Sequence, residues 1–181
     1  KLRGNPNDVD AYILRASVRS EMKEYVGAKA DYSTAIRLMP QHVDAYLLRA
    51  YAEVELKDFD AAIADCSYVI RMNDQYAHAY EVRGEVLSGK GDYEGAVADY
   101  SQAIRLEPFD YDLYHMRAEA RAALKDYGAA IADYTESIRL GSGGESYRKR
   151  ADARAALKDY EGAKADYEEA LTRGPNRGVF R

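Results

Sequence analysis

Two groups of histidine and carboxylate side chains are the residues whose types and spacing are best suited to chemistry. The groups are His78, Glu81 and Glu85, and then Asp112, His115 and Glu119. Within each group the side chains are three or four residues apart, so they would share one face of a helix. Imidazole and carboxylate groups are ligands of zinc and other divalent ions. The chemistry to consider is therefore metal binding, which requires the two groups to converge.

The alternative for the same residues is a set of solvated polar side chains on a helical surface, and the sequence favours it. Neighbouring helix axes lie roughly 8 to 10 Å apart, and nothing in the spacing makes the two groups converge. The chain also lacks a glycine-rich phosphate loop after a strand, a nucleophile elbow and a histidine pair at metal-ligand spacing on one helix. We therefore expect no metal site, no cofactor and no enzymatic activity.

The composition argues against several other classes of protein. Charged residues make up 31% of the 181 residues, and the net charge of −5 disfavours nucleic acid or an anionic membrane as the main partner. The single cysteine, Cys66, cannot form an intramolecular disulfide and leaves the cellular compartment undefined. No apolar run approaches the roughly 18 residues that a membrane-spanning helix needs.

A repeat in the sequence predicts the helices that would position these side chains. Tyr12, Tyr46, Tyr80 and Tyr114 are each 34 residues apart, and Tyr147 follows after 33. An arginine stands three residues after each of these tyrosines, and a small residue follows each arginine. Apolar and small residues recur three and four apart, with no stretch of period two, so each unit is predicted to be a pair of helices. The chain is therefore expected to be a row of five helical hairpins.

Small residues at positions 8 and 20 of each unit would let the two helices approach closely, beside large rings at positions 4, 17 and 24. An acidic residue precedes each second helix, where it could cap free N–H groups. These residues are Asp58, Asp92, Asp126 and Asp159, with Glu24 in the first unit, which is the only unit that lacks a good cap. In the joint 140–146, we expect Gly141 to end a helix in the left-handed conformation and Ser142 with Glu145 to form a capping box. A tight turn is favoured there, with a hinge as the alternative.

The pattern resembles the tetratricopeptide repeat family, whose unit has a large residue at position 4, small residues at 8, 20 and 27, an aromatic residue at 24 and proline at 32. Arginine replaces the family's usual leucine at position 7. The resemblance implies an all-α fold, an α-α superhelix (solenoid) of helix-turn-helix repeats whose concave wall is formed by the first helices. The predicted segments are a tail of a preceding repeat at 1–8, repeats at 9–42, 43–76, 77–110, 111–143 and 144–177, and a tail at 178–181.

The arginine at position 7 has a predicted partner in its own hairpin. If the hairpin turns near position 15, position 7 lies level with about position 23, where every unit has an aspartate. The predicted pairs are Arg15–Asp31, Arg49–Asp65, Arg83–Asp99, Arg117–Asp133 and Arg150–Asp166. We expect each pair to be partly buried, with the arginine stem over the neighbouring tyrosine ring. The role of each pair would be structural, because such pairs fix the register of the two helices more than they add stability.

The concave face of the first helices is the predicted ligand groove. Its residues are Ile13, Leu14, Leu47, Leu48, Tyr51, Val54, Glu81, Val82, Glu85, Asp112, His115, Met116, Glu119, Arg148 and Lys149. The face is apolar in the first two units, acidic in the next two and basic in the last. A complementary ligand would be a peptide or helix of another protein, with apolar side chains against the first two units and lysine or arginine against the third and fourth. For Leu47 and Leu48 the alternative is packing against neighbouring helices.

The function expected from this pattern is that of a non-enzymatic scaffold that binds a partner protein, without nucleic acid or membrane insertion. The alternative is a structural spacer or a self-assembling array with no groove ligand. The opening residues, KLRGNP, match the end of a second helix. The last helix is expected to expose Ala163, Tyr167, Ala170 and Leu171, or to bury them against the tail or another molecule. Self-association through uncapped ends is therefore a further alternative.

Overall fold

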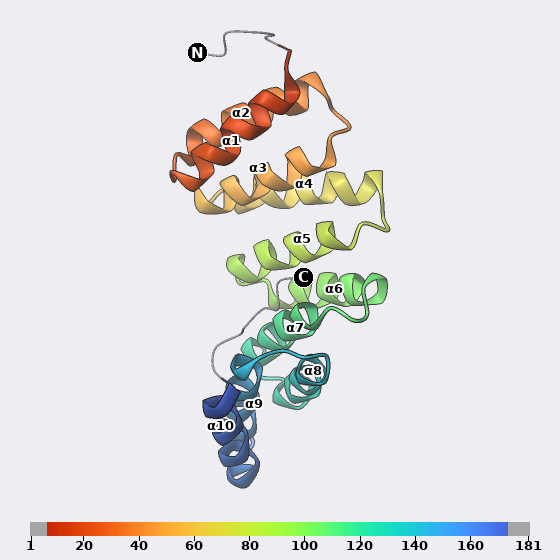
Figure 1. Ribbon diagram of the computed structural model, residues 1–181. Coiled ribbons are helices and arrows are strands. Elements are labelled where there is room, and N and C mark those ends of the chain that lie inside the picture. The colour runs from red at the N-terminus through yellow and green to blue at the C-terminus, as the bar shows by residue number, and fades with distance from the viewer. Residues whose placement is uncertain (1–6, 174–181) are drawn as a thin grey trace. The chain divides into compact units, whose positions relative to one another are not determined.

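The structure is a computed structural model that describes residues 7–173, in which all the regular structure is helical (Figure 1). The helices are α1 Val9–Glu21, α2 Tyr25–Leu38, α3 Val43–Glu55, α4 Phe59–Met72, α5 Ala77–Lys90, α6 Tyr93–Leu106, α7 Tyr111–Ala123, α8 Tyr127–Arg139, α9 Gly144–Ala156 and α10 Tyr160–Arg173. The fold class is all-α, of the α-α superhelix (solenoid) type, as predicted. The predicted segments 1–8 and 178–181 and the end of the fifth repeat lie wholly or partly outside the described residues.

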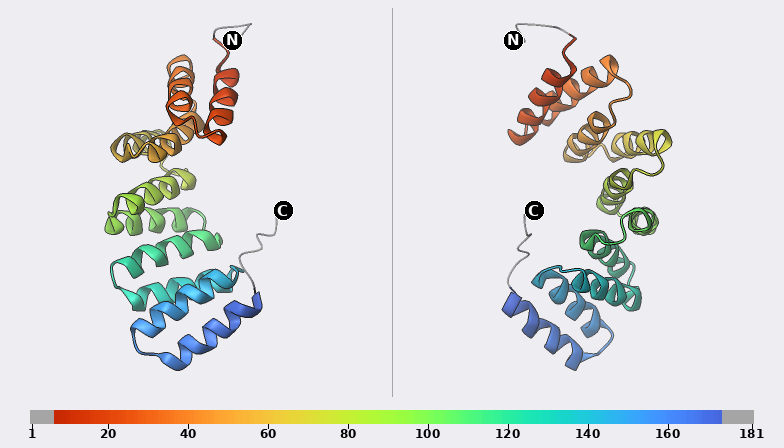
Figure 2. Two further views of the ribbon diagram at one scale, coloured as in Figure 1. Left: turned by 90° about the vertical axis from the view of Figure 1, so that its left-hand side faces the viewer. Right: turned by 45° about the vertical axis from the view of Figure 1, so that its right-hand side comes forward.

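Within each of the two halves of the chain, up to α4 and from α6 onward, helices that follow one another in the sequence pack against one another (Figure 2). Within hairpins, α1 packs on α2, α3 on α4, α7 on α8, and α9 on α10. Between hairpins, α2 packs on α3, α6 on α7, and α8 on α9. Smaller contacts join α1 with α3 and α7 with α9, so the packing is between near neighbours along the chain, which is typical of repeat proteins.

Pairs of buried alanines lie inside four of the hairpins. The pairs at positions 8 and 20 are Ala16 with Ala28, Ala50 with Ala62, Ala118 with Ala130, and Ala151 with Ala163, and none of these residues is more than 3% exposed. A methyl group leaves room for the two helices to pack closely, and the tyrosines at position 24 close the space beside it. Tyr32, Tyr100 and Tyr134 are at most 2% exposed.

The turn inside each hairpin has a residue in the left-handed backbone region. That residue is a lysine in four hairpins, Lys23, Lys57, Lys125 and Lys158, with φ between 61° and 65°, and Gly91 in the remaining one, with φ of 89°. In the α7–α8 turn the N–H of Lys125 donates to the Ala122 carbonyl, and the N–H of Asp126 donates to the Arg121 carbonyl, both at 2.9 Å. These bonds satisfy free carbonyls at the end of α7.

The predicted caps of the second helices are present in three hairpins. The carboxylates of Asp92, Asp126 and Asp159 accept from backbone N–H groups three residues later, at 3.0 to 3.2 Å. The prediction is wrong for Asp58, which makes no side-chain cap bond. Glu24, in the unit predicted to lack a good cap, makes no such bond either. The Asp58 carboxylate instead accepts from Lys29 Nζ at 2.8 Å.

The joint between α8 and α9 confirms one of the two backbone and capping predictions made for it. Gly141 has the expected positive φ, 107°. The predicted capping box of Ser142 and Glu145 is wrong, because the residue before α9 is Gly143 and has no side chain to cap with. Glu145 accepts instead from Arg148 on the same helix at 3.0 Å.

The chain divides into two compact units, one ending at Val86 and the other beginning at Leu87. The first unit has a core of aliphatic, small and tyrosine side chains centred on Cys66, Val69 and Val82, each 0% exposed. In the second unit the buried clusters lie around Tyr100 and Tyr134. Each unit therefore has a hydrophobic core of its own.

Candidate functional site

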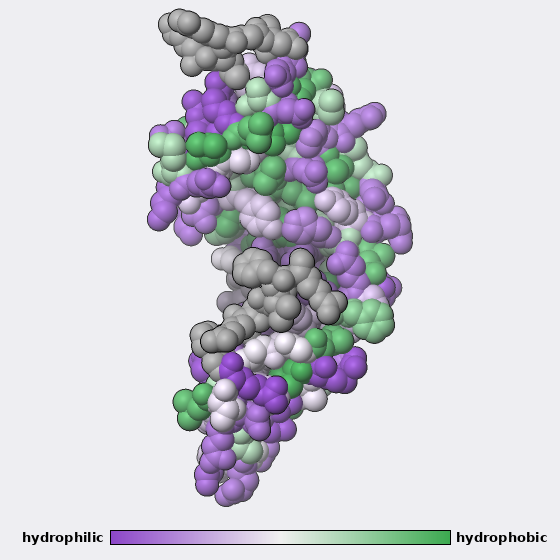
Figure 3. All heavy atoms as spheres, viewed as in Figure 1, coloured by the Kyte–Doolittle hydropathy of each residue, from purple (hydrophilic) through white to green (hydrophobic). Residues whose placement is uncertain are grey.

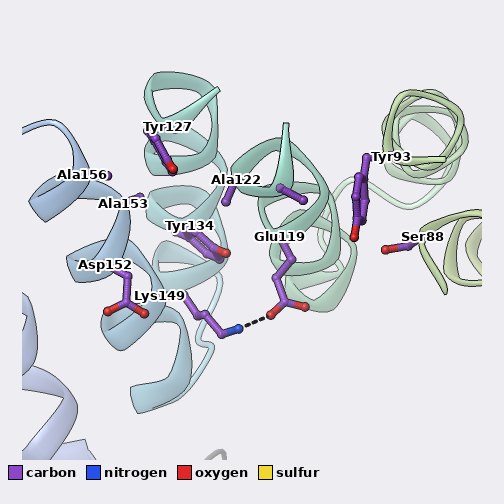
Figure 4. Close-up of a pocket in the computed structure, with 11 residues that line it drawn as sticks. Ser88, Tyr93, Glu119, Ala122, Tyr127, Tyr134, Lys149, Asp152, Ala153 and Ala156 are labelled. Carbon is purple, nitrogen blue, oxygen red and sulfur yellow. Dashed lines mark ion pairs between the residues drawn. The ribbon is translucent and has the colours of Figure 1, made fainter. Parts of the chain in front are cut away.

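A pocket of about 450 Å³ lies in the unit that begins at Leu87 (Figure 4). Its lining residues are Ser88, Tyr93, Glu119, Ala122, Ala123, Tyr127, Tyr134, Lys149, Asp152, Ala153 and Ala156. Most of them come from α7 and α9, which are the first helices of their repeats. The pocket therefore lies on the wall that the sequence predicts to face a ligand.

Four alanines explain why this wall is hollow. Ala122 and Ala123 end α7, and Ala153 and Ala156 lie near the end of α9. They belong to two nearly identical segments, AEARAALKDY at 118–127 and ADARAALKDY at 151–160. A methyl group fills little of the space that a longer side chain would occupy, so the alanine-rich segments leave a cavity between the helices.

Tyrosine rings form the sides of the pocket. The Tyr134 ring is 1% exposed and meets the His115 ring edge-on, with 5.5 Å between the ring centroids. Desolvation and the nearby carboxylate of Glu119 raise the Tyr134 pKa well above its usual value, so its hydroxyl is neutral at physiological pH. The pocket thus combines flat aromatic surface with the neutral hydroxyl group of Tyr134.

An ion pair crosses the mouth of the pocket. Lys149 Nζ on α9 lies 2.6 Å from Glu119 Oε1 on α7, and the two side chains point toward each other in Figure 4. Asp152, one turn along α9, accepts from the Tyr167 hydroxyl at 2.5 Å. Glu119 and Lys149 are 43% and 32% exposed, so their attraction is worth less than about 1 kcal/mol and a ligand charge can replace either partner.

His115 lies behind the pocket and does not line it. Its Nδ1 is 2.8 Å from the Ser146 hydroxyl, and its Nε2 is 3.9 Å from Glu119. Desolvation lowers the His115 pKa, and this effect exceeds the opposing attraction of Glu119. The neutral ring therefore supports Tyr134 and is not a cation at physiological pH.

The metal-binding chemistry considered from the sequence has no geometric support in the structure. Among residues 7–173, no three or more histidine, cysteine, aspartate or glutamate side chains are grouped so that they could hold a metal ion. His78 instead pairs with Glu81 on its own helix, at 2.9 Å.

Two of the predicted groove residues are wrongly assigned. Leu47 is 3% exposed and Val82 is 0% exposed, because both belong to the core cluster of the first unit. The packing alternative therefore holds for Leu47. Ile13, Leu48 and Val54 are half-buried against the cores of the same unit.

The other predicted groove residues retain exposed surface to different degrees. In the first unit Leu14 is 67% and Tyr51 is 39% exposed. In the second unit, Glu119 and Lys149 line the pocket, whereas Met116 packs beside Tyr100.

Asp112 and Arg148 are exposed near the starts of α7 and α9. Arg148 is paired with Glu145 and lies 3.7 Å from Asp152. The first helices thus bring only part of the predicted set to a pocket.

An acidic patch lies beside an aromatic ring in the first unit, formed by Tyr51, Glu81 and Glu85. Desolvation raises the Tyr51 pKa, and the charges of Glu85 and Glu81 raise it further. Desolvation and repulsion from Glu81 also raise the Glu85 pKa. The three side chains are therefore close enough to interact, and a ligand cation would relieve the repulsion between the two carboxylates.

The arginines at position 7 contact the aspartates at position 23 in four hairpins. In each contact the arginine Nε and Nη2 donate to the two carboxylate oxygens, at 2.5 to 2.9 Å. The four pairs are Arg15–Asp31, Arg49–Asp65, Arg117–Asp133 and Arg150–Asp166. Each of these guanidinium groups lies 5.4 to 5.7 Å from the centre of the tyrosine ring three residues earlier. Arg83 lies over Tyr80 in the same way at 5.8 Å, while Asp99 belongs to the other unit.

The sequence analysis did not predict that a third residue, from the preceding repeat, contacts the arginine in four of the repeats. The Nη1 of the arginine donates at 2.9 to 3.0 Å to a hydroxyl at position 25 of the preceding repeat. The contacts are Arg49–Ser33, Arg83–Ser67, Arg117–Ser101 and Arg150–Thr135. The signal was available, since position 25 is serine or threonine in four units and Glu168 in the fifth. One arginine therefore joins its own hairpin to the hairpin before it.

Paired helices, nearest-neighbour packing and a hollow on the first helices define a helical-repeat protein. The sequence matches tetratricopeptide repeat families at residues 13–77, 81–145 and 144–177, and the chain belongs to the tetratricopeptide repeat family. Repeats of this family generally form non-enzymatic scaffolds for protein–protein interaction. None of the helices described is long and apolar enough to cross a membrane.

Solved structures show the same fold at low sequence identity. MamA from Desulfovibrio magneticus RS-1 has a TM-score of 0.83 and 13% identity, with 93% of this chain and 95% of that chain covered. A further MamA crystal structure has a TM-score of 0.79 and 17% identity, covering 91% and 90%. A thermophilic repeat protein of Thermus thermophilus has a TM-score of 0.70 and 20% identity, covering 93% of each chain. No curated protein sequence matches the chain.

Proposed function

We propose that the protein is an interaction scaffold that binds an extended segment of a partner protein across the pocket between α7 and α9. The observation that carries the proposal is the alanine-lined hollow of about 450 Å³ with tyrosine sides. Ligand pockets commonly have volumes of about 300 to 1,000 Å³ and are mostly apolar, with a few placed polar groups. One apolar side chain of the partner would enter this hollow.

The charges around the pocket favour a ligand with a basic residue next to the apolar one. Glu119 and Asp152 contribute two carboxylates and Lys149 one ammonium group. A ligand lysine or arginine would pair with Glu119 in place of Lys149, which is already exposed to solvent. Such charges add more to orientation and association rate than to affinity.

In the unit ending at Val86, the acidic patch of Tyr51, Glu81 and Glu85 is proposed to bind a second basic residue. The other groove residues that keep some exposed surface stay within the proposal, as apolar or polar contacts. They are Ile13, Leu14, Leu48, Val54, Asp112, His115, Met116 and Arg148. The proposed partner is therefore a protein segment with both apolar and basic side chains.

Filling the hollow tests the proposal. Peptides selected from a random phage-displayed library on the wild-type chain should lose affinity at least tenfold for the Ala123→Leu/Ala156→Leu variant. Both alanines are exposed in the pocket, so leucine would occupy ligand space without disturbing the core. Calorimetry with the selected synthetic peptides measures the loss.

The matched control is Ala132→Leu, an equally exposed alanine on α8 that does not line the pocket. This variant should bind the same peptides with unchanged affinity. If the selected peptides bind the filled pocket as tightly as the wild type, the ligand site lies elsewhere and the proposal is wrong.

A further inference from the structure

A short chain of buried hydroxyl groups ends at the His115 ring behind the pocket. His115 Nδ1 lies 2.8 Å from the Ser146 hydroxyl, which lies 3.2 Å from the Ser137 hydroxyl. Ser137 in turn donates to the Tyr111 carbonyl at 3.0 Å. Both serines are 0% exposed, so bulk water does not replace these contacts.

The number of hydrogens in this chain determines which nitrogen of His115 is protonated. A carbonyl oxygen only accepts, so the single hydroxyl hydrogen of Ser137 goes to Tyr111. The contact between the two serines must then use the hydrogen of Ser146. With that hydrogen used, the contact between Ser146 and His115 needs a hydrogen on Nδ1. In the neutral ring, Nε2 therefore has only a lone pair.

This unprotonated nitrogen lies near a carboxylate oxygen that already has a cation. Glu119 Oε1 is 3.9 Å from His115 Nε2 and 2.6 Å from Lys149 Nζ. Two acceptors do not attract each other, so with a neutral ring Glu119 pairs with Lys149 alone. A proton on Nε2 turns the ring into a second cation beside the same oxygen.

The charged and titratable groups that face His115 come from three helices. They are Glu119 and Asp112 on α7, Glu145 and Lys149 on α9, and the neutral Tyr134 on α8. Desolvation has the largest effect and lowers the His115 pKa below its ordinary value, 6.5. Glu119 opposes this shift, and Lys149 adds to it. The ring therefore takes up its second proton only below pH 6.5.

Glu119 can exchange partners because the mouth of the pocket is open to water. The Glu119 side chain is 43% exposed and that of Lys149 is 32% exposed. The surface over α9 is largely hydrophilic in the lower part of Figure 3. The His115 side chain is 15% exposed, so a proton can reach it from the solvent.

We propose that His115 is a positioning residue for Glu119, so that a proton on His115 Nε2 and a cation at the mouth of the pocket compete for one carboxylate. Protonation draws Glu119 toward the ring and away from Lys149, or away from a basic ligand residue in its place. Only the step to a ligand rests on the proposed function. Each cation then weakens the binding of the other by linkage, so a basic segment binds less tightly in acidic solution.

The tautomer is tested by NMR on the chain with 15N-labelled histidine. At neutral pH the His115 ring should have its hydrogen on Nδ1. His42 is the internal control, because its Nδ1 accepts from the Ala45 N–H at 3.3 Å and its hydrogen is therefore on Nε2. The His115→Asn variant identifies the His115 signal. A hydrogen on Nε2 of His115 at neutral pH would overturn the proposal.

The competition is tested without a ligand by following the titration of the same ring in variants. Lys149→Met should move the midpoint to higher pH by about 0.3 pH units or more, and Glu119→Gln should move it to lower pH. Lys164→Met is the matched control, because Lys164 is an exposed lysine of α10 that does not line the pocket, and it should leave the midpoint unchanged.

The double variant shows whether the effect of Lys149 passes through Glu119. In the Glu119→Gln background, Lys149→Met should move the midpoint less, because the shared carboxylate is gone. Midpoints that do not move in the single variants would overturn the proposal, and so would shifts that simply add in the double variant.

Peptides selected at neutral pH for the proposed pocket test the consequence for binding. Their affinity should fall about threefold or more between pH 7.5 and pH 5. In His115→Asn, which keeps a donor toward Ser146 but cannot take up a proton, the ratio of the two affinities should be close to one. An equal fall in wild type and His115→Asn would contradict the role of His115. A library that yields no peptide contradicts the proposed function alone, and the titrations still decide whether the two cations compete.

Discussion

At the scale of single residues, the aspartate at position 23 gathers two arginines from the same first helix. Asp133 accepts from Arg117 through both carboxylate oxygens and from Arg121 Nη1 at 2.7 Å. Its side chain is 5% exposed, while the two arginines are 15% and 24% exposed. The carboxylate is therefore the buried member of the group, and its removal leaves two cations without their shared partner.

Asp133→Ala is expected to destabilise the protein by about 3 kcal/mol, since breaking a buried ion pair leaves uncompensated charge. Denaturant unfolding followed by circular dichroism measures the change. The control on the same helix is Glu136→Ala, which removes an exposed pair with Arg139 and should cost less than about 1 kcal/mol. Equal effects of the two substitutions would contradict the structural role proposed for Asp133.

Glu53 differs from the residues at the same position of the other repeats. It is 3% exposed on α3, where the first, fourth and fifth repeats have an arginine. Lys29 lies 3.1 Å from Oε1, but among residues 7–173 no hydrogen-bond partner reaches Oε2. Desolvation raises the Glu53 pKa, and the attraction of Lys29 offsets this only in part.

The raised pKa of Glu53 predicts a pH dependence of stability. Between the ordinary glutamate pKa, 4.5, and the higher folded value, the folded protein binds more protons than the unfolded chain. The contribution of Glu53 to stability therefore falls as the pH rises through this window. Glu53→Gln should remove that fall, so the difference in unfolding free energy between variant and wild type should change with pH above 4.5. A difference that is constant from pH 4.5 to 8 would refute the assignment.

At the scale of residues, the sequence predicted the contacts that recur at the same positions of successive repeats. It missed contacts for which partners from different repeats compete. Counting from the turn places each arginine opposite its aspartate, and the structure has four such contacts. The same reasoning made Asp58 a helix cap. Lys29, from the preceding repeat, takes that carboxylate instead, and a cap prediction from local sequence does not include a cation 29 residues away.

At the scale of elements, the hairpin turns have lysine where the backbone favours glycine. Lys125 has φ of 62°, and an L-residue in the left-handed region is strained by about 1 to 2 kcal/mol. Gly91 occupies the corresponding turn with φ of 89° and open space around its Cα. The fold therefore tolerates this strain in four turns and avoids it in one.

Lys125→Gly is expected to raise the unfolding free energy by about 1 kcal/mol, because relief of the backbone strain exceeds the entropy cost of glycine. The denaturant midpoint measures the change. The matched control is Lys164→Gly inside α10, where the backbone is helical and glycine should cost about 1 kcal/mol. A lower midpoint for Lys125→Gly would show that the lysine makes a compensating contact.

The helices were predictable because tyrosines and alanines mark the same places in every unit. The pocket could not be predicted in the same way, because a cavity depends on small side chains as much as on large or polar ones. Ala122 and Ala123 were not among the predicted groove residues, although Val54, at the position in α3 equivalent to Ala122, was. Leu47 and Val82 were assigned to the groove because the sequence gives the face of a helix but not how far the next helix covers it.

At the scale of the whole molecule, the two units have separate cores, and the contacts within each unit join helices that are one or two places apart in the sequence. Stability should therefore be local, with each repeat supported by the next.

Val69→Ala tests this locality. Val69 is 0% exposed in the core of the first unit, and the lost side-chain volume should cost about 2 kcal/mol. Native-state hydrogen exchange should become faster in α3 and α4, while protection in α9 and α10 stays the same. A uniform loss of protection along the chain would show that the molecule unfolds as one cooperative block.

The joints between repeats also bear on how such a chain can change its length over generations. Tyr46 donates from its hydroxyl to the Pro40 carbonyl of the preceding repeat at 3.1 Å, and Tyr114 donates to Pro108 at 3.2 Å. Arg49 reaches back to Ser33 across the same boundary. These joints thus pair donors of one repeat with acceptors of the repeat before it. A gene duplication that inserts one whole unit supplies both halves of every new joint, whereas insertion of half a unit leaves donors and acceptors unmatched. Copy number in this lineage can therefore change in whole repeats without new compensating mutations.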